Sequence, residues 1–336
     1  MITQTGTSAG QLIKVDLFIH QEGGSEPANE TFSLSKPVPS ASVLTVNFDI
    51  APYLKSYISH TSLTPVTGLT ATPAANYVYC KIVVTNPAAS VSDQYVIGYN
   101  GYGYFADGYN PTLDANVMLD EGEYYMVKNQ NYGALFYFQE AGLGEAWTAK
   151  YECLDGSTAD VDINLTTENA HIPYIPPTHK NNGGSTLKIS KDGALQKTFT
   201  FTEICEPKYT PVVCDFVNKY GVFQTIIFFK VSTNKMTMSN SQFNMMPSSV
   251  NYSTSKNISQ VFNVNGIEST TVNTGFVREG YDDIIKQILL SETIRLDGKP
   301  VIIDTKSLDL QKSINKRLIN YTLTFKFANN IVNNIQ

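Results

Sequence analysis

Alternation of apolar and polar residues with a period of two is the feature that most constrains the fold of this 336-residue chain. The clearest case is INYTLTFKF at residues 319–327, where every second residue is apolar and the residues between are polar or charged. The segments LIKVDLFI at 12–19 and VLTVNFDI at 43–50 show the same pattern. Successive side chains of a strand point to opposite faces, so the pattern predicts strands with one solvated face, as antiparallel sheets allow. We therefore expect a mainly β protein built from tandem β-sandwich domains.

Turn and helix signals separate these strands. Asp192-Gly193 and Asp297-Gly298 each lie between two alternating segments and predict tight β-hairpins. Helical periodicity is rare. Residues 51–58 predict one or two helical turns with a proline in the first turn. Residues 280–291 carry an apolar stripe at helical spacing and predict one packed α-helix near the C-terminus.

The length of the chain favours two domains. Residues 166–185 contain three prolines, paired asparagines, paired glycines and no periodicity, which predicts a linker. We expect a β-rich domain at 13–165 before this linker and a second β domain at 186–330 after it. Residues 1–12 are polar and unpatterned, so we expect a flexible N-terminal arm that becomes ordered only on a neighbouring subunit.

The apolar stretch YGVFQTIIFFKV at 220–231 requires a cover. On a strand, one of its faces belongs to the core, and the other is half apolar, with Ile226 and Phe228 at its centre. Two alternatives stay open. The helix at 280–291 covers this face, which is the more economical arrangement because the apolar stripe of the helix itself needs a sheet. Otherwise a neighbouring subunit covers it, since exposed apolar patches usually mark interfaces, and Ile226 and Phe228 are then interface residues.

The segment YVIGYNGYGYFADGYN at 95–110 interleaves tyrosines with glycines. Tyrosine supplies a large amphipathic contact area at low entropic cost, and antibody loops use a similar mixture. One interpretation is a pair of ordinary strands with tight glycine turns. The other is a contact surface for a protein or a glycan, and its candidate residues are Tyr99, Tyr102, Tyr104 and Tyr109.

The residues that carry chemistry in enzymes form no recognisable set in this sequence. The four histidines, His20, His60, His171 and His179, have no metal-ligand spacing, and no nucleophile elbow or P-loop is present. Residues 101–106, GYGYFA, match a relaxed dinucleotide-binding fingerprint but precede a turn instead of a helix. DVDIN at 160–164 begins like a calcium loop but lacks its glycine and its glutamate. We therefore predict no cofactor, no metal and no enzymatic activity.

Charge and hydropathy restrict the partners. The formal net charge of −6 argues against a nucleic-acid backbone as the main ligand, although DNA could still move past a passive acidic wall. We expect no signal peptide, because no basic region leads into an apolar run, and no membrane insertion, because no apolar run reaches 18 residues. The four cysteines are widely spaced and are expected to be buried thiols, although Cys205 and Cys214 could be cross-strand neighbours.

Three segments resemble a known class of protein. Their sequences are CEPKYTPVVCDFVNKYGVFQTIIFF at 205–229, TVNTGFVREGYDDIIKQILLSETIRLDGKPVIIDT at 271–305 and KRLINYTLTFKFANN at 316–330. In order and character they are similar to the C-terminal half of virion structural proteins of tailed bacteriophages infecting Bacteroidota, including the crAss-like group. FDIAPYLKSYI at 48–58 is also similar. The resemblance implies a ring or hub component of the tail or neck, with a tail-tube-like β domain at 186–330 and no catalytic residues.

These observations predict a structural subunit that assembles with copies of itself into a ring in the tail or neck of a virion. Its other expected partners are phage tail or neck proteins, its expected place of assembly is the bacterial host cytoplasm, and no sequence-specific nucleic-acid binding is expected. One alternative is a receptor- or glycan-binding tail protein that uses the Tyr/Gly segment. Another is an enzyme, such as a depolymerase, with carboxylates that the sequence alone does not pair.

Overall fold

The computed structural model divides the chain into two compact units. Unit 1 comprises Met1–Glu121, Asn131–Phe199 and Val217–Gln224, and unit 2 comprises Gly122–Gln130, Thr200–Phe216 and Thr225–Gln336. The structure describes residues 1–21, 24–60, 70–71, 76–108, 118–120, 122–127, 147–153, 156, 158–162, 171–172, 184–204, 208–246, 253, 255, 257–307 and 319–332.

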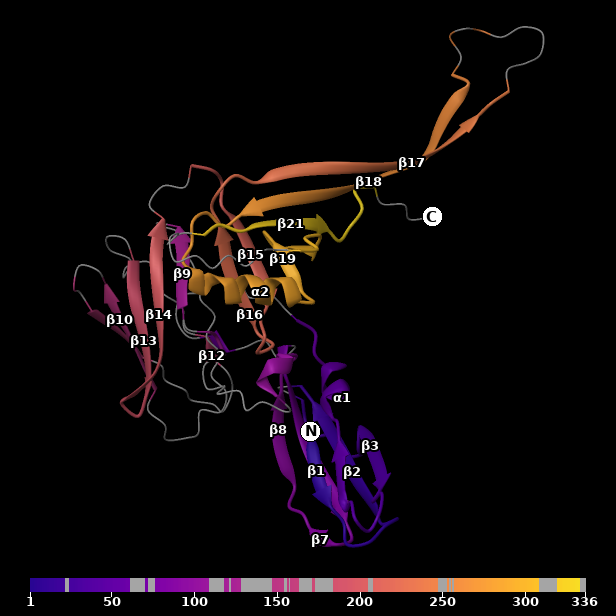
Figure 1. Cartoon of the computed structure of the whole chain (residues 1–336), viewed down its shortest axis with the longest axis vertical. Helices are drawn as coiled ribbons and strands as arrows, with labels where there is room; N and C mark the ends of the chain where they lie inside the picture. Colours follow the sequence, from indigo (N-terminus) through magenta and orange to yellow (C-terminus); the bar gives the residue numbers. More distant parts are fainter. Residues whose placement is uncertain are drawn as a thin grey trace. The chain divides into compact units, whose positions relative to one another are not determined.

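The prediction of a mainly β protein is confirmed. The described residues form several antiparallel sheets (Figure 1). Two α-helices occur among them, α1 (Ala51–Lys55) and α2 (Asp282–Leu290), together with the short 3-10 helices η2 (Phe105–Asp107) and η4 (Glu279–Tyr281). Pro52 lies in the first turn of α1, as the sequence predicts.

The N-terminal part of unit 1 contains a sheet with strand order β3-β2-β6-β7, in which β8 also pairs with β6. Its strands are β2 (Leu12–His20), β3 (Phe32–Pro37), β6 (Val78–Asn86), β7 (Ala89–Ser90) and β8 (Gln94–Gly98). The apolar residues that alternate along β2 are buried, namely Ile13, Val15, Leu17 and Ile19. They join one core with the buried residues of β6 and of α1.

The N-terminus is ordered on its own chain, which corrects the predicted flexible arm at 1–12. Strand β1 (Ile2–Thr5) pairs with β4 (Thr45–Phe48), and Ile2 lies opposite Phe48 in the shared core. The amide of Asn86 donates a hydrogen bond of 3.1 Å to the Thr5 carbonyl. Four residues are too few to establish a periodicity, so the sequence pattern does not reveal this strand.

A second group of strands in unit 1 has the order β11-β10-β13-β14. These are β10 (Trp147–Cys153), β11 (Thr158–Asp162), β13 (Gly184–Lys191) and β14 (Ala194–Ile204), and a separate pair joins β5 (Thr70–Ala71) to β12 (His171–Ile172). The turn at Asp192-Gly193 has positive φ at both residues, which confirms this predicted hairpin. Strand β14 passes from unit 1 into unit 2, where β9 (Gly122–Val127) pairs with it.

The pairing of β13 with β10 explains why the two units differ from the predicted domains at 13–165 and 186–330. Strand β13 begins at the end of the predicted linker at 166–185 and pairs along its length with β10, with Leu187 opposite Tyr151. Both of these side chains are fully buried. Backbone pairing across the predicted linker therefore keeps β13 in unit 1, while residues 122–130 belong to unit 2.

Unit 2 is built on a seven-stranded sheet with the order β16-β15-β19-β20-β21-β18-β17. Its strands are β15 (Val212–Val217), β16 (Phe223–Phe228), β17 (Thr233–Asn244), β18 (Ser259–Asn273), β19 (Ile294–Leu296), β20 (Lys299–Ile303) and β21 (Thr322–Phe327). The predicted hairpin at Asp297-Gly298 is confirmed, because this turn joins β19 to β20 with positive φ at both residues. Leu323 and Phe325 of β21 are fully buried, as the alternation predicts.

Helix α2 buries most of the predicted stripe, whose last member, Leu289, is only partly buried. Tyr281, Ile284, Ile285 and Ile288 are buried, whereas Leu290 at the end of the helix is exposed. Asp282 and Asp283 occupy the first turn, where carboxylates interact favourably with the helix dipole. The ring of Tyr125 lies 5.7 Å from that of Tyr281 and 5.9 Å from that of Phe229, and so connects the start of α2 to the end of β16.

The candidate interface residues Ile226 and Phe228 belong to the core. Ile226 is 1% exposed and Phe228 is 0% exposed within the single chain. The Phe228 ring lies 6.3 Å from the ring of Phe325 on β21. Neither side chain presents surface to a neighbouring subunit, which corrects their assignment as interface residues and agrees with the alternative that places them in the fold.

We expect Phe228→Ala to lower the free energy of unfolding of unit 2 by about 3–5 kcal/mol, because truncating a buried aromatic side chain leaves a cavity. Phe276→Ala is the matched control, since Phe276 lies in the same unit and is 58% exposed. Its effect should stay within about 0.5 kcal/mol. Denaturant unfolding of both variants checks this expectation, and equal losses of stability would contradict it.

A second expectation concerns pH. Burial raises the pKa of the Asp215 carboxyl, and this effect exceeds the opposing effects of the Thr225 hydrogen bond and the Arg295 charge. A raised pKa in the folded state means that the folded chain binds the proton more tightly than the unfolded chain, so the ionised carboxylate destabilises the fold at neutral pH. Asp215→Asn should therefore melt at a higher temperature than the wild type at neutral pH, and the difference should shrink as the pH falls. A variant that is less stable at neutral pH would contradict this assignment.

Candidate functional site

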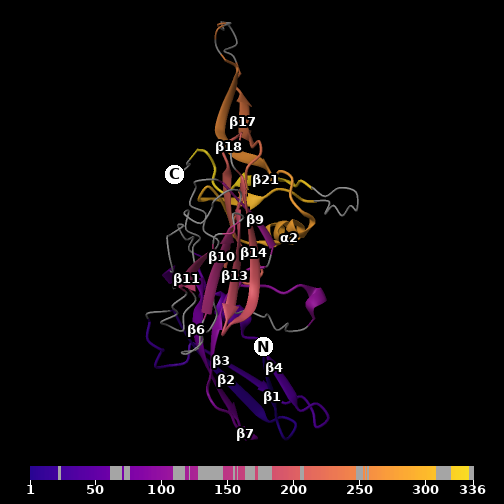
Figure 2. The same cartoon turned by 90° about the vertical axis from the view of Figure 1, so that its left-hand side faces the viewer.

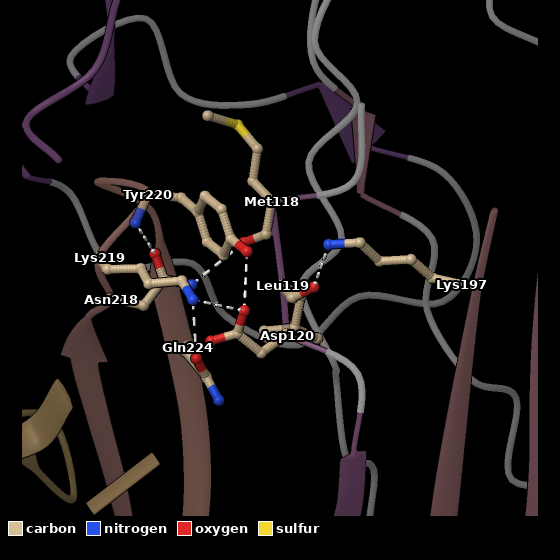
Figure 3. Close-up of polar contacts among 8 residues, drawn as sticks. All are labelled: Met118, Leu119, Asp120, Lys197, Asn218, Lys219, Tyr220 and Gln224. Atoms are coloured by element: carbon tan, nitrogen blue, oxygen red, sulfur yellow. Dashed lines mark hydrogen bonds and ion pairs between the residues drawn. The ribbon is translucent and has the colours of Figure 1, made fainter. Parts of the chain in front are cut away.

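A buried asparagine organises a polar cluster in unit 1 (Figure 3). Asn218 is 0% exposed, and its Oδ1 accepts hydrogen bonds from the backbone N–H groups of Tyr220 at 3.0 Å and Val222 at 3.3 Å. Its Nδ2 donates to the Met118 carbonyl at 3.1 Å and to Oε1 of Gln224 at 3.4 Å. An amide offers two donors and two acceptor lone pairs, so the side chain is fully used in holding its own turn to residue 118.

The charged members of this cluster are paired with one another. One oxygen of Asp120 accepts a hydrogen bond of 2.7 Å from the Tyr220 hydroxyl and lies 2.9 Å from Nζ of Lys219. The ammonium groups of Lys219 and Lys197 lie 5.1 Å and 5.4 Å from the centre of the Tyr220 ring, within the range of a cation–π interaction. Lys197 also donates to the Leu119 carbonyl at 2.8 Å. We interpret the cluster as a clamp that holds 118–120 against 218–224.

The Tyr/Gly segment packs against the same turn. The backbone N–H of Tyr102 donates to the Lys219 carbonyl at 2.8 Å, and a Cβ at Gly101 would lie only 2.6 Å from that oxygen. The backbone can therefore approach this closely because residue 101 has no side chain. At this position the glycine serves an internal contact of unit 1.

The candidate contact tyrosines differ in their surroundings. Tyr99 packs against the buried cluster that includes Val217 and Tyr220. Tyr102 and Tyr104 are partly buried, with their rings 6.0 Å apart, and burial raises the pKa of Tyr102. Tyr109 lies outside the described residues. The structure leaves Tyr99, Tyr102 and Tyr104 all partly buried, and binding of a glycan by this segment stays a prediction.

The largest exposed feature of unit 2 is the hairpin formed by β17 and β18, which we call the ribbon (Figures 1 and 2). Only its base is supported by further strands, because β18 pairs with β21 over Ser269–Asn273. Beyond this point Ile331 and Val332 hydrogen-bond to Gly266 and Asn265. From Ser241 to Asn244 and from Ser259 to Phe262, the described residues form two strands alone.

The ribbon contains a β-bulge, and the extra residue of this bulge lies in β18. Ser239 pairs with Asn265 and Ser241 pairs with Phe262, so two steps along β17 match three steps along β18. The extra residue is accommodated at Asn263, which has φ 53°, a conformation that asparagine tolerates better than most residues. Such a bulge bends a ribbon and increases its twist.

Apolar side chains are exposed on both faces of the ribbon. Near its outer end Phe243 is 45% exposed and Phe262 is 50% exposed, and their rings lie 5.6 Å apart on one face. The opposite face carries Met236 and Met238, which are also exposed. A Cβ at Gly266 would lie 2.9 Å from Cε of Met236, so this glycine makes room for the methionine. Charge is scarce, since β17 and β18 contain only Lys235 and Glu268.

Other kinds of site find little support in the described part of the chain. Among the described residues, no group of three or more His, Cys, Asp or Glu side chains could hold a metal ion. None of the helices in those ranges combines the length and the apolar character that a membrane crossing demands. Cys80, Cys153 and Cys214 are buried, and burial raises the pKa of Cys80 to about 11. Cys205 lies outside the described residues.

Comparison of the chain with models of protein families, with curated proteins and with solved structures finds no match. The resemblance to phage virion proteins therefore rests on the sequence segments alone and stays a prediction.

Gly101→Ala should destabilise unit 1 by about 1–3 kcal/mol, the usual cost of forcing extra volume into a packed site. The added Cβ would meet the Lys219 carbonyl and the backbone of Tyr220. Gly122→Ala is the matched control, because a Cβ at that position has no neighbour within 4 Å. Thermal melting of the two variants measures the difference, and indistinguishable melting temperatures would show that the close approach does not exist.

Proposed function

We propose that this protein is a structural subunit of a bacteriophage virion, which assembles with copies of itself and with other tail or neck proteins into a ring. The single observation that carries the proposal is the ribbon, because it presents apolar side chains that unit 2 itself does not cover. The resemblance of 205–229, 271–305 and 316–330 to virion structural proteins supplies the biological setting.

The stability of the ribbon is the physical reason to expect a partner. An isolated two-stranded hairpin is marginal in water, and independent stability requires a third strand or a covered hydrophobic face. The outer part of the ribbon has neither among the described residues. Burying a side chain of the size of Phe contributes about 1.5–3 kcal/mol, so covering Phe243 and Phe262 would give a contact that many copies can repeat.

The composition of the ribbon also favours a protein partner. Aromatic residues and methionine are enriched in the centres of protein interfaces, and charged residues are depleted there. Four of the seven methionines of the chain, Met236, Met238, Met245 and Met246, lie on or next to β17 and are exposed. A neighbouring subunit in a closed ring is a partner of this kind, since a contact repeated by rotation closes without an unused end.

We expect the double variant Phe243→Ser/Phe262→Ser to weaken assembly at least about tenfold, which corresponds to about 1.4 kcal/mol. The stability of the isolated subunit should change little, because both side chains are half exposed there. Sedimentation velocity over a range of protein concentrations measures assembly, and thermal melting of the dilute chain measures stability.

Leu195→Ser is the matched control, because Leu195 is an equally exposed aliphatic residue at a hairpin of unit 1. This variant should assemble like the wild type. A wild-type chain that stays monomeric at high concentration, alone and with its tail partners, would count against the proposed function.

A further inference from the structure

We infer that β17 pairs with β17 of a second copy of this chain, in antiparallel orientation across a two-fold axis. The inference rests on the proposed function, which it deepens by assigning a second contact to the ribbon and by naming the backbone edge that makes it.

The first observation is an open edge. Strand β17 is the last strand of the seven-stranded sheet, and its only partner among the described residues is β18. It is 12 residues long and exposed along nearly all of its length. Every second N–H and C=O group of a terminal strand points away from the sheet, so β17 offers a row of unpaired donors and acceptors to another strand.

The second observation is that β17 lacks most of the features that block such pairing. Proteins protect open edges with proline, charged residues, bulges or very short strands. Strand β17 contains no proline, and Lys235 near its start is its one charged residue. The bulge of the ribbon places its extra residue in β18, so β17 remains regular from Thr233 to Asn244. By contrast, β3, another terminal strand, ends in Lys36 and Pro37.

The third observation concerns the strand that pairs with the open edge of β17. A strand that pairs here lies beside exposed Met236 and Met238 on one face and beside Phe243 on the other. It must therefore be uncharged and carry apolar side chains on both faces, which β17 itself does. Two other terminal strands of the chain do not match, because β16 is buried and β11 contains Asp160 and Asp162.

The distribution of charge along β17 permits its pairing with β17 of a second copy. Two chains of net charge −6 repel each other, but residues 237–244 carry no charge at all. Like charges placed directly opposite in a sheet are destabilising. A two-fold axis near Asn240 avoids this arrangement, because Lys235 of each copy then lies across from an uncharged residue of the other copy.

The symmetry separates this inference from the proposed ring. An isologous contact uses the same patch on both copies and stops at a pair. A ring needs a heterologous contact, which the exposed apolar face of the ribbon at Phe243 and Phe262 would make with a different surface of the neighbouring subunit. Pairing through β17 would thus join two subunits in addition to the contact that closes the ring.

The test uses single cysteines in the full-length chain. Ser239→Cys, Asn240→Cys and Ser241→Cys are each oxidised under mild conditions, and disulfide-linked pairs are measured on a non-reducing gel. Directly opposite residues of antiparallel strands have Cβ atoms about 4.5–5.5 Å apart, so at least one of the three positions should link to the same residue of a second copy. Gln260→Cys on β18 is the control, because three strand spacings of about 4.8 Å would separate the two copies of this residue. The wild-type chain reports any background from native cysteines.

A second variant disrupts the edge without removing apolar side chains from the core. Met238→Lys/Asn240→Lys should weaken pairing at least tenfold in sedimentation velocity, while Ser259→Lys/Gln260→Lys on β18 should leave it unchanged. Same-residue links at β17 together with this selective loss support the inference. Self-association that persists in Met238→Lys/Asn240→Lys, with no same-residue link, overturns the inference and leaves the proposed ring intact. Linked pairs that never form anything larger support β17 pairing and contradict the ring. A strictly monomeric chain without links overturns both.

Discussion

A two-stranded ribbon has two faces and no interior, and this constraint governs the most exposed part of the protein. In the remainder of unit 2, sheet strands such as β21 place alternate residues in a core, where Leu323 and Phe325 are fully buried. The ribbon extends beyond that support, so Phe243, Phe262 and the methionines of β17 stay in contact with water. Apolar area that remains exposed on folding contributes nothing to the stability of the monomer. The exposed apolar side chains of the ribbon would contribute to stability only in contact with a second surface.

Both units contain buried apolar residues, and unit 1 also has a polar cluster that joins distant segments. Their chain segments are interleaved, since unit 1 includes 217–224 and unit 2 includes 122–130. In unit 1 the polar clamp around Asn218 holds residues that are one hundred positions apart, and Gly101 allows a third segment to approach the same turn. In unit 2 the stability comes from apolar packing, with Ile226 and Phe228 in the core and the stripe of α2 buried.

The sequence predicted those features that depend on local periodicity or turn chemistry. The strands at 12–19 and 319–327, the two Asp-Gly hairpins and the helix near 280–291 are all present, with ends that differ by a few residues. The predicted arm at 1–12 was wrong, because β1 pairs with the distant strand β4. The units differ from the predicted domains because β13 pairs with β10, and most of the predicted linker at 166–185 lies outside the described residues. The clamp was missed for the same reason, since nothing near Asn218 in the sequence points to Met118. The outer part of the ribbon was missed because both of its faces are exposed, so no buried face imposes an alternation on residues 233–244 and 259–264.

Amide hydrogen exchange, followed by mass spectrometry in dilute and in assembled protein, tests the central claim most directly. We expect the amides of residues 233–244 to exchange rapidly in the dilute chain. On assembly their exchange should slow at least about tenfold, because a partner then covers the open edge of β17. Amides of β15 should show the same protection in both states, which serves as an internal reference. Assembled protein in which residues 233–244 exchange as fast as in the dilute chain would contradict the claim that the ribbon is the contact arm.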